Sequence, residues 1–564
     1  MAGLILALAF TLLAPAIPGG PATFPHFVDV TERSGIGFVH TGGSLEKDYI
    51  LEVNGSGVVL FDCDGDGDLD IYFPNGSALD LPPGARPLRD ALYQNDGHFR
   101  FREVSEAAGL GDAGWSCGAT AADVDNDGDL DLFVANFGPD VLYLNRGDGR
   151  FDEQRGSGVE DPAWGASSAF GDVNGDGLVD LFVANYLEFD RRAVRRRGED
   201  PACTYKGFPI FCGPGGLPPA SSSLFINLGA GRFRDASAEW GVRSAPPAYA
   251  LGVLFVDLNR DRRPDVLVAN DTMANYLFLN QAGRSFLEAG LYLGLAYNEY
   301  GTPQASMGVT AGDARGVGRE DIFITSYEDD TDTYHRAEPD GFFSDATWPS
   351  GLGEPTYKPL GWGTFFFDAD LDGRLDLFVA NGQLMPQADH MRSSPGYRQR
   401  CELYRGDGTG RFEPLGARAG EGFQVRRSFR GAAFGDLDAD GDPDIVVSAI
   451  DERPLVLENR GSDPGGGPGN GWVAFRTRGT RSNRDGIGAR VRIVAEGRAR
   501  EHYVRSASGY ASQSEMAARF GLGEARAVER VVVEWPSGLE EEFPAPPLRT
   551  VTLLVEGTGS KVAR

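Results

Sequence analysis

The sequence is poor in cysteine, lysine and histidine, and it has no long hydrophobic run after its first residues. Five cysteines without zinc-site spacing exclude a disulfide scaffold and a zinc finger. With 53 Lys and Arg against 82 Asp and Glu, the net charge of −29 disfavours nucleic acid and anionic membranes as partners. No later stretch approaches the roughly 20 apolar residues of a membrane span, so we expect none in the mature chain.

Residues 1–22 have the pattern of a secretory signal peptide. An apolar run from Leu4 to Leu13 precedes the small-x-small sequence Ala14-Pro15-Ala16. Signal peptidase could cleave after Ala16 or, alternatively, after Ala22. An uncleaved anchor is the alternative, but the run is short for about 30 Å of hydrocarbon. The sequence therefore predicts a secreted, extracellular or cell-surface protein, with the periplasm as an alternative location.

Glycine and proline are abundant, at 78 and 34 of 564 residues, and favour many turns over long helices. A nine-residue loop, D-x-D/N-x-D-G-x-x-D, recurs with variations and begins at Asp62, Asp123, Asp172, Asp257, Asp313, Asp368 and Asp436. Apolar segments such as GVVLF precede the loops, and alternating segments such as LDLFVAN follow them, as in β-strands. With two further strand-like segments per repeat, the pattern predicts an all-β fold, a seven-bladed β-propeller over residues 23–461.

A second repeat predicts how the ring closes. A segment that starts with phenylalanine follows most loops, and its copies begin at Phe27, Phe101, Phe151, Phe233, Phe286, Phe343 and Phe412. The Phe27 copy precedes the first acidic loop, whereas the last loop has no copy after it. We therefore expect the N-terminal strand to complete the last blade and tie the two ends of the ring together.

Residues 462–470 form a Gly/Pro-rich linker, and residues 471–558 are predicted to form a small all-β domain. The strands expected in this domain are residues 472–478, 488–495, 502–507, 528–535 and 550–556. An insertion in the third blade contains Cys203 and Cys212, and a local disulfide between them is the expected pairing in an exported protein. Cys63 and Cys117 are a possible second pair that the sequence cannot establish.

The acidic loops have the composition of calcium sites. Two carboxylates about 4 Å apart repel by about 4 kcal/mol at an effective dielectric constant near 20, so a bare loop would splay or take up protons. A hard divalent cation compensates this charge through side chains 1, 3, 5 and 9 and the backbone carbonyl of position 7, with glycine at position 6 for the bend. Ligation by oxygen alone favours Ca²⁺ over Mg²⁺. EF-hands are excluded, because position 12 is an apolar strand residue rather than a glutamate.

Five loops are predicted to bind calcium, and for a sixth loop the sequence leaves calcium binding undecided. The ligands of the five are Asp62, Asp64, Asp66, Asp68 and Asp70; Asp123, Asp125, Asp127, Asp129 and Asp131; Asp172, Asn174, Asp176, Leu178 and Asp180; Asp368, Asp370, Asp372, Arg374 and Asp376; and Asp436, Asp438, Asp440, Asp442 and Asp444, with position 7 acting through its carbonyl. The sixth set is Asp257, Asn259, Asp261 and Asp265, where Arg262 replaces the glycine. In the Asp313 loop Arg315 takes a ligand position, so we expect an arginine in place of an ion.

The loops with their flanks, such as FDADLDGRLDLFVANG and LYLNRGDGRF, resemble the FG-GAP/VCBS repeats of integrin-α-like propellers. NDTMANYLFLN and YGTPQASMGVTAGD resemble the repeat proteins related to cartilage acidic protein. SNRDGIGARV, SGYASQ, FGLG and VEWPSG resemble the ASPIC/UnbV domain of those proteins. The resemblance implies an exported calcium-binding propeller in matrix, adhesion or surface roles rather than catalysis. Arg519 departs from the pattern, since histidine is expected before FGLG.

The remaining motifs do not favour catalysis. The match to G-x-S-x-G at residues 114–118 precedes a strand and an acidic loop rather than a helix, and the six histidines offer no placed base. The two RGD triplets, at Arg146 and Arg405, fall in turns where such residues are common. We predict no enzymatic activity and an extracellular protein or glycan as partner. The alternative is a secreted hydrolase or lyase that acts on a surface polymer or glycan.

Two further groups of residues have two interpretations each. The arginines between Arg191 and Arg197 form either a solvated loop or a contact for an acidic glycan. Six residues of the C-terminal domain form either a binding face or turns and core: Asn483, Arg484, Asp485, Tyr510, Gln513 and Trp535.

Overall fold

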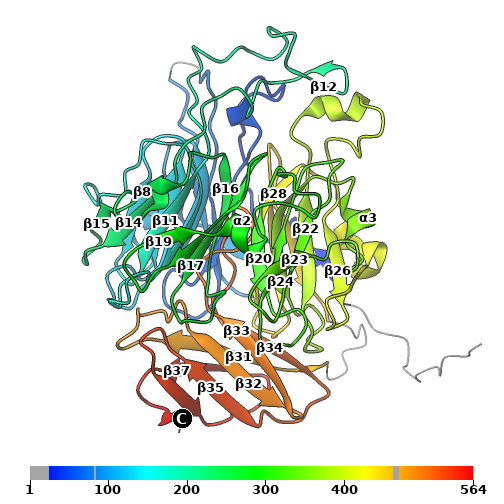
Figure 1. Cartoon of the computed structure of the whole chain (residues 1–564). Helices are drawn as coiled ribbons and strands as arrows, with labels where there is room; N and C mark the ends of the chain where they lie inside the picture. The colour runs from blue at the N-terminus through cyan, green and yellow to red at the C-terminus, as the bar shows by residue number, and fades with distance from the viewer. Residues whose placement is uncertain (1–24, 82–83, 462–468, 563–564) are drawn as a thin grey trace, which may run out of the picture.

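The computed structural model describes residues 25–81, 84–461 and 469–562 and is an all-β protein (Figure 1). The predicted signal peptide lies outside the described residues, as does the linker up to residue 468. Seven four-stranded antiparallel sheets occur in the described part of residues 25–461. None of the helices in the described ranges has the length and apolar character needed to cross a bilayer.

The strands of these sheets, from the innermost to the outermost, are β2 (Val59–Phe61), β3 (Asp70–Phe73), β4 (Ala91–Asn95) and β5 (Phe101–Glu103); β6 (Ser116–Ala122), β7 (Asp131–Asn136), β8 (Val141–Asn145) and β9 (Phe151–Glu153); β10 (Gly165–Gly171), β11 (Asp180–Asn185), β14 (Ser223–Asn227) and β15 (Phe233–Asp235); β16 (Ala250–Val256), β17 (Asp265–Asn270), β18 (Tyr276–Asn280) and β19 (Phe286–Glu288); β20 (Val309–Gly312), β21 (Asp321–Ile324), β22 (Thr333–Ala337) and β23 (Phe343–Asp345); β24 (Gly361–Phe367), β25 (Asp376–Asn381), β26 (Glu402–Gly406) and β27 (Phe412–Pro414); and β28 (Phe429–Gly435), β29 (Asp444–Ala449), β30 (Leu455–Asn459) and β1 (Phe27–Asp29).

The sheets are arranged as the blades of a propeller. Their first strands contact one another in the order β2, β6, β10, β16, β20, β24 and β28, and β28 contacts β2. The N-terminal strand β1 pairs antiparallel with β30, with Phe27 opposite Asn459, so the predicted closure by this strand is confirmed. The other six predicted phenylalanine segments are the outermost strands of their sheets.

Each sheet is buried on both faces because it packs between two neighbours. In β7, Leu132 and Val134 pack in a cluster with the preceding sheet, whereas Phe133 and Ala135 pack in a cluster with the following sheet. Successive residues of a strand point to opposite faces, so both sets must be apolar. This explains why the segments of the LDLFVAN type lack the polar alternation of a half-exposed strand.

The C-terminal domain consists of two sheets around one core. Its strands are β31 (Gly471–Arg478), β32 (Arg490–Ala495), β33 (Arg498–Tyr503), β34 (Ala518–Gly523), β35 (Arg530–Glu534), β36 (Glu540–Phe543), β37 (Val551–Val555) and β38 (Ser560–Lys561). The predicted domain end at residue 558 is wrong, because β38 pairs with β36 beyond it. The predicted strand at 502–507 is also misplaced. β33 ends at Tyr503 because the chain then leaves the domain and enters the ring.

Residues 504–515 fill the centre of the ring. Gln513 forms a parallel bridge with Val59 of β2, and Gly509 forms an antiparallel bridge with Val309 of β20. Tyr510 is fully buried, its ring centroid lies 4.8 Å from that of Trp362 in β24, and its hydroxyl donates to a backbone carbonyl. Because inner strands of several sheets contact this segment, the C-terminal domain is anchored in the ring.

Short elements complete the fold. The predicted disulfide between Cys203 and Cys212 is confirmed, and it encloses the hairpin of β12 (Thr204–Tyr205) and β13 (Phe208–Pro209). Cys63 and Cys117 are not bonded to each other, and both are buried free thiols. The helical turns are α1 (Ser105–Ala108), α2 (Gly290–Leu293), α3 (Gly353–Thr356), η1 (Ile50–Glu52), η2 (Val242–Ser244), η3 (Pro386–His390), η4 (Gly416–Ala419) and η5 (Glu421–Gln424).

Candidate metal centres

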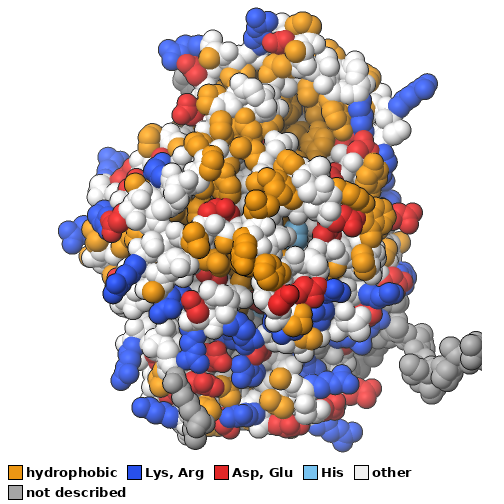
Figure 2. All heavy atoms as spheres, in the orientation of Figure 1, with side chains coloured by type: hydrophobic (Ala, Val, Ile, Leu, Met, Phe, Trp, Pro, Cys, Tyr) orange, Lys and Arg blue, Asp and Glu red, His pale blue; other side chains and the backbone are white. Residues whose placement is uncertain are grey.

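The acidic loops lie at one end of the ring and connect the first and second strands of each blade. Position 9 of each loop is the first residue of the second strand, as Asp70 is in β3 and Asp131 in β7. The C-terminal domain packs against this end of the ring (Figure 1). Figure 2 shows Lys/Arg and Asp/Glu side chains interspersed where the domain meets the ring. The candidate sites therefore lie at or beside an interdomain interface.

Four loops bring three carboxylates each into a group whose oxygens lie within 4.8 Å of one another. The groups are Asp62, Asp64 and Asp66; Asp123, Asp125 and Asp127; Asp368, Asp370 and Asp376; and Asp436, Asp438 and Asp444. The loops that begin at Asp172 and Asp257 form no such group of acids in the described residues, and both have asparagine at position 3. All donors are oxygens, the set that hard cations prefer.

Backbone geometry holds these carboxylates inward. Asp62 accepts hydrogen bonds from the backbone N–H groups of Gly65 and Gly67, at 2.8 and 3.0 Å. Gly67 has a φ of 101°, which requires glycine at the bend. In the Asp257 loop Arg262 adopts a φ of 69° at the same position, a strained conformation for a residue with a side chain. The replacement of glycine by Arg262 therefore strains the backbone of this loop.

Several carboxylates of the loops are so buried that their ionised form is disfavoured in the absence of a cation. Without a bound cation, burial and the neighbouring carboxylate of Asp485 raise the pKa of Asp123 to about 7. Burial raises the pKa of Asp131 to about 8 and that of Asp436 to about 6. Oδ1 of Asp436 is buried and has no hydrogen-bond partner in the described part of the chain. A divalent cation compensates both the repulsion and the missing partner, so the residues fit such an ion.

The aspartate at position 9 has a structural role that sequence reasoning missed. Asp131 accepts a hydrogen bond from the N–H of Val124 in its own loop and another from the N–H of Asn145 at the end of β8. The equivalent aspartates in the other five loops with a predicted or open calcium site make the same pair of contacts. Position 9 therefore fastens the loop to the third strand, and in two of the four groups it also lies with the other carboxylates.

An asparagine at the end of the third strand joins neighbouring blades. Asn145 donates from Nδ2 to the carbonyl of Cys63 in the preceding blade at 2.8 Å, and to Leu130 in its own blade at 3.0 Å. The residues that make the same contact to the preceding blade are Asn95, Asn227, Asn280 and Asn459. The sequence contained a signal for this contact, because an asparagine recurs as the last residue of segments such as LYLN, LFIN and LFLN.

In the Asp313 loop an arginine lies against the carboxylate, as predicted. Arg315 contacts both carboxylate oxygens of Asp321 and also donates to the carbonyl of Ala337 at 2.6 Å. Asp321 is fully buried, so its charge needs a partner. The guanidinium provides this partner from within the same blade.

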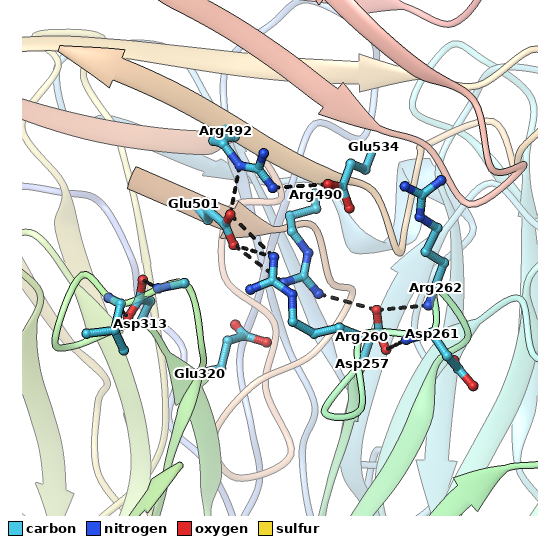
Figure 3. Close-up of polar contacts among 12 residues, drawn as sticks. Asp257, Arg260, Asp261, Arg262, Asp313, Glu320, Arg490, Arg492, Glu501 and Glu534 are labelled. Atoms are coloured by element: carbon cyan, nitrogen blue, oxygen red, sulfur yellow. Dashed lines mark hydrogen bonds and ion pairs between the residues drawn. The ribbon is translucent and has the colours of Figure 1, made fainter. Parts of the chain in front are cut away.

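In the Asp257 loop the neighbouring cation comes from the C-terminal domain (Figure 3). Nη2 of Arg490 lies 3.3 Å from Oδ2 of Asp257, and Nη1 lies 3.5 Å from Oε2 of Glu501. Arg262 pairs with Glu540 across the same interface at 3.5 Å. The Arg490 side chain is only 7% exposed, so this pair is buried between the domains. Calcium in this loop stays a prediction, and the observed cationic neighbour is a guanidinium.

In two other loops an arginine of the C-terminal domain lies near the carboxylate at position 1. Arg519 lies 3.3 Å from Asp436 and 3.0 Å from Glu515, and its guanidinium covers the ring of Trp472. Arg476 lies 3.7 Å from Asp62. Arg519 thus occupies the position where the family pattern expects histidine, and there it links the domain to position 1 of a predicted calcium loop.

The other residues singled out in the sequence have structural surroundings. Ser116 lies in β6, is fully buried, and donates a hydrogen bond to Asp90 at 3.0 Å. It therefore lacks the exposure that a catalytic nucleophile needs. Arg196 pairs with Asp48, and Arg191 pairs with Asp80. The other three arginines of that cluster also have carboxylate partners, so the interpretation as an ion-paired loop is favoured.

The predicted tail residues contribute to the interface and the core. The side-chain carbonyl of Gln513 accepts from Thr120 and from the N–H of Ala121, at 2.9 and 2.7 Å. Asp485 accepts from the N–H of Asp123 at 2.8 Å. Trp535 is fully buried in the core of the C-terminal domain. These residues hold the domains together rather than form an exposed face.

Comparison with known proteins identifies the two kinds of domain. Residues 479–561 match the family model for ASPIC and UnbV, and residues 62–134, 123–183 and 393–447 match that for the FG-GAP-like repeat. Cartilage acidic protein 1 of Homo sapiens is 26% identical over 86% of this chain and 60% of its own length. The Mus musculus protein is 25% identical over 59% of this chain and 49% of its own length. The chain thus matches about half to three fifths of these relatives.

Likeness to solved structures is weaker. A structure of an Agrocybe aegerita lectin that recognises non-reducing terminal N-acetylglucosamine has a TM-score of 0.38 at 15% identity, over 64% of this chain and 79% of the lectin. BBS1N in complex with ARL6DN has a TM-score of 0.35 at 10% identity, over 75% of this chain and 96% of that chain. The family matches and the curated relatives show that the chain has FG-GAP-like repeats, a C-terminal ASPIC/UnbV domain and weak homology to cartilage acidic protein 1.

Proposed function

We propose that this protein is an exported, calcium-binding interaction protein without enzymatic activity, in which calcium stabilises the blades. The observation that carries the proposal is the recurrence of three clustered carboxylates at the same position of four blades. Burial raises the pKa of the carboxylate at position 1 of each group, at Asp62, Asp123, Asp368 and Asp436, and each group consists of oxygen donors alone. The weak homology to cartilage acidic protein 1 supports an extracellular location.

The filled centre of the ring supports binding over catalysis. Tyr510 and its neighbours occupy the centre of the ring on the side of the C-terminal domain, so this centre offers no open channel for a substrate from that side. Ser116, the only candidate nucleophile of the sequence motif, is buried on a strand. The filled centre and the buried Ser116 therefore support the binding function over the alternative of a hydrolase or lyase.

Metal analysis of the purified protein tests the proposal. After dialysis against 1 mM Ca²⁺ and Mg²⁺ together, a concentration of the extracellular order, the protein should retain about four or five calcium ions per chain and little magnesium. Binding to an array of extracellular proteins and glycans should then depend on calcium. Absence of retained calcium, or turnover of a surface polymer, would contradict the proposal.

A further inference from the structure

A groove of about 810 Å³ lies on the outer rim of the ring, between the blade of β20 to β23 and the blade of β24 to β27. Its lining contains Trp348, which follows β23, and three arginines of the next blade: Arg374, Arg405 and Arg411. Two acidic residues, Asp407 and Glu413, also line it, so the arginines outnumber the acids by one. Trp348 is 52% exposed, which is unusual for so large an apolar side chain. An aromatic ring beside several guanidinium groups is the composition of many binding hot spots.

The structure holds Trp348 as a platform. A Cβ atom on Gly353, the first residue of α3, would lie 2.6 Å from Cδ2 and Cε3 of the indole. The indole therefore rests against the backbone of Gly353, and only glycine leaves room for it there. About half of the side chain stays exposed to water. An exposed aromatic face of this kind can stack on the apolar face of a sugar ring.

The arginines of the groove are coupled to a candidate calcium loop. Arg405 lies 3.1 Å from Asp370 and 3.3 Å from Asp372, and Arg374 also pairs with Asp372. These carboxylates are positions 3 and 5 of the loop that begins at Asp368. The side chain of Arg411 is exposed, and its charge acts on the neighbouring carboxylate of Asp407, which also lines the groove. A cation in the loop would neutralise the carboxylates that hold Arg374 and Arg405, and it would make the groove more positive.

We propose that this groove binds an acidic polysaccharide, with Trp348 stacked on a sugar ring and the three arginines on its carboxylate or sulfate groups. Calcium in the Asp368 loop strengthens this binding. The inference rests on the proposed function and names the class of partner. Guanidinium groups bind carboxylates and sulfates in a bidentate manner. The net charge of −29 does not prevent binding, because repulsion is screened beyond about 8 Å at physiological ionic strength.

Titration calorimetry with heparin, polygalacturonate and neutral dextran tests the proposal, in Ca²⁺ and in EDTA. We expect the full chain to bind heparin and polygalacturonate but not dextran, and to bind more weakly in EDTA. Trp348→Ala and Arg411→Gln should each weaken binding about tenfold, the effect of losing one hot-spot contact. Trp348→Phe should retain most of the affinity. Arg155→Gln, at an exposed arginine on a distant rim position that is 84% exposed, should have no effect.

The outcomes separate this inference from the proposed function. If the protein is stabilised by calcium but binds neither acidic polysaccharide, the groove assignment is wrong and the proposed function stands. If calcium neither binds nor stabilises the protein, the proposed function itself fails. Equal binding in EDTA overturns the coupling to the Asp368 loop. Binding of poly-glutamate that survives Trp348→Ala overturns the choice of a polysaccharide over an acidic peptide.

Discussion

Removal of calcium should destabilise the ring by an amount that follows from the number of carboxylate groups. A site with a dissociation constant of about 10⁻⁴ M adds about 1.4 kcal/mol to the free energy of unfolding at about 10⁻³ M Ca²⁺. Four groups of three carboxylates then contribute about 6 kcal/mol. At about 2.1 cal/mol/K per residue, unfolding of residues 25–461 has an entropy of about 0.9 kcal/mol/K. Chelation should therefore lower the melting temperature by about 6 °C.

A variant of a single loop makes the test specific. Asp125→Asn with Asp127→Asn removes two oxygen charges from a loop whose ends stay in place, because Asp123 and Asp131 keep their backbone contacts. In Ca²⁺ the double variant should melt about 1 to 2 °C below the parent protein. In EDTA it should melt at the same temperature or slightly higher, because repulsion between the two carboxylates is relieved.

Differential scanning calorimetry at matched ionic strength provides the measurement. Asp148→Asn is the matched control, since Asp148 is an exposed aspartate in a turn of the same blade and is 58% exposed. It should leave both melting temperatures unchanged. Equal midpoints of the parent protein in Ca²⁺ and in EDTA would refute structural calcium. A full calcium shift in the double variant would show that the ion binds elsewhere.

Three further predictions follow from the same contacts. In EDTA, the raised pKa of Asp131, about 8 against an ordinary value of 3.8, means that the folded chain binds more protons than the unfolded chain between these values. The melting temperature in EDTA should therefore fall as the pH rises from about 5 to 8. Saturating Ca²⁺ should abolish this fall, and a fall of equal size in both conditions would contradict the assignment. Asn145→Ala leaves a buried and a partly buried carbonyl without this donor and should cost about 2 to 4 kcal/mol in urea unfolding. Asn145→Asp, which cannot donate either, should cost at least as much, and a neutral effect of both would show that Asn145 does not join the two blades. Tyr510→Ala should cost about 3 to 5 kcal/mol, whereas Tyr510→Phe, which loses only a hydroxyl bond, should cost about 1 kcal/mol. If Tyr510→Ala lowers the stability of the C-terminal domain but leaves that of the ring unchanged, the segment does not support the ring.

Much of the ring follows from local patterns. Short apolar segments predict the strands, although the alternation expected in LDLFVAN is absent because both faces of each sheet are buried. Recurring Asp and Gly residues predict the loops between the first and second strands. The position of Phe27 before the first loop predicts its pairing with the last blade, since only an N-terminal strand can fill that place. The pairing of Cys203 with Cys212 also follows from proximity in the sequence. These features depend on residues close in the chain or on a counted repeat.

What the sequence determined by itself is thus the type of each element and the chemistry of each loop, because periodicity and ligand spacing are local properties. Only the tertiary structure decided that residues 504–515 enter the ring and that Arg490 lies against Asp257. Only the structure placed Trp348 over Gly353 and beside the arginines of the next blade. These contacts join residues far apart in the chain or in different blades. Their energies depend on burial and on the meeting of opposite charges, which no local pattern records.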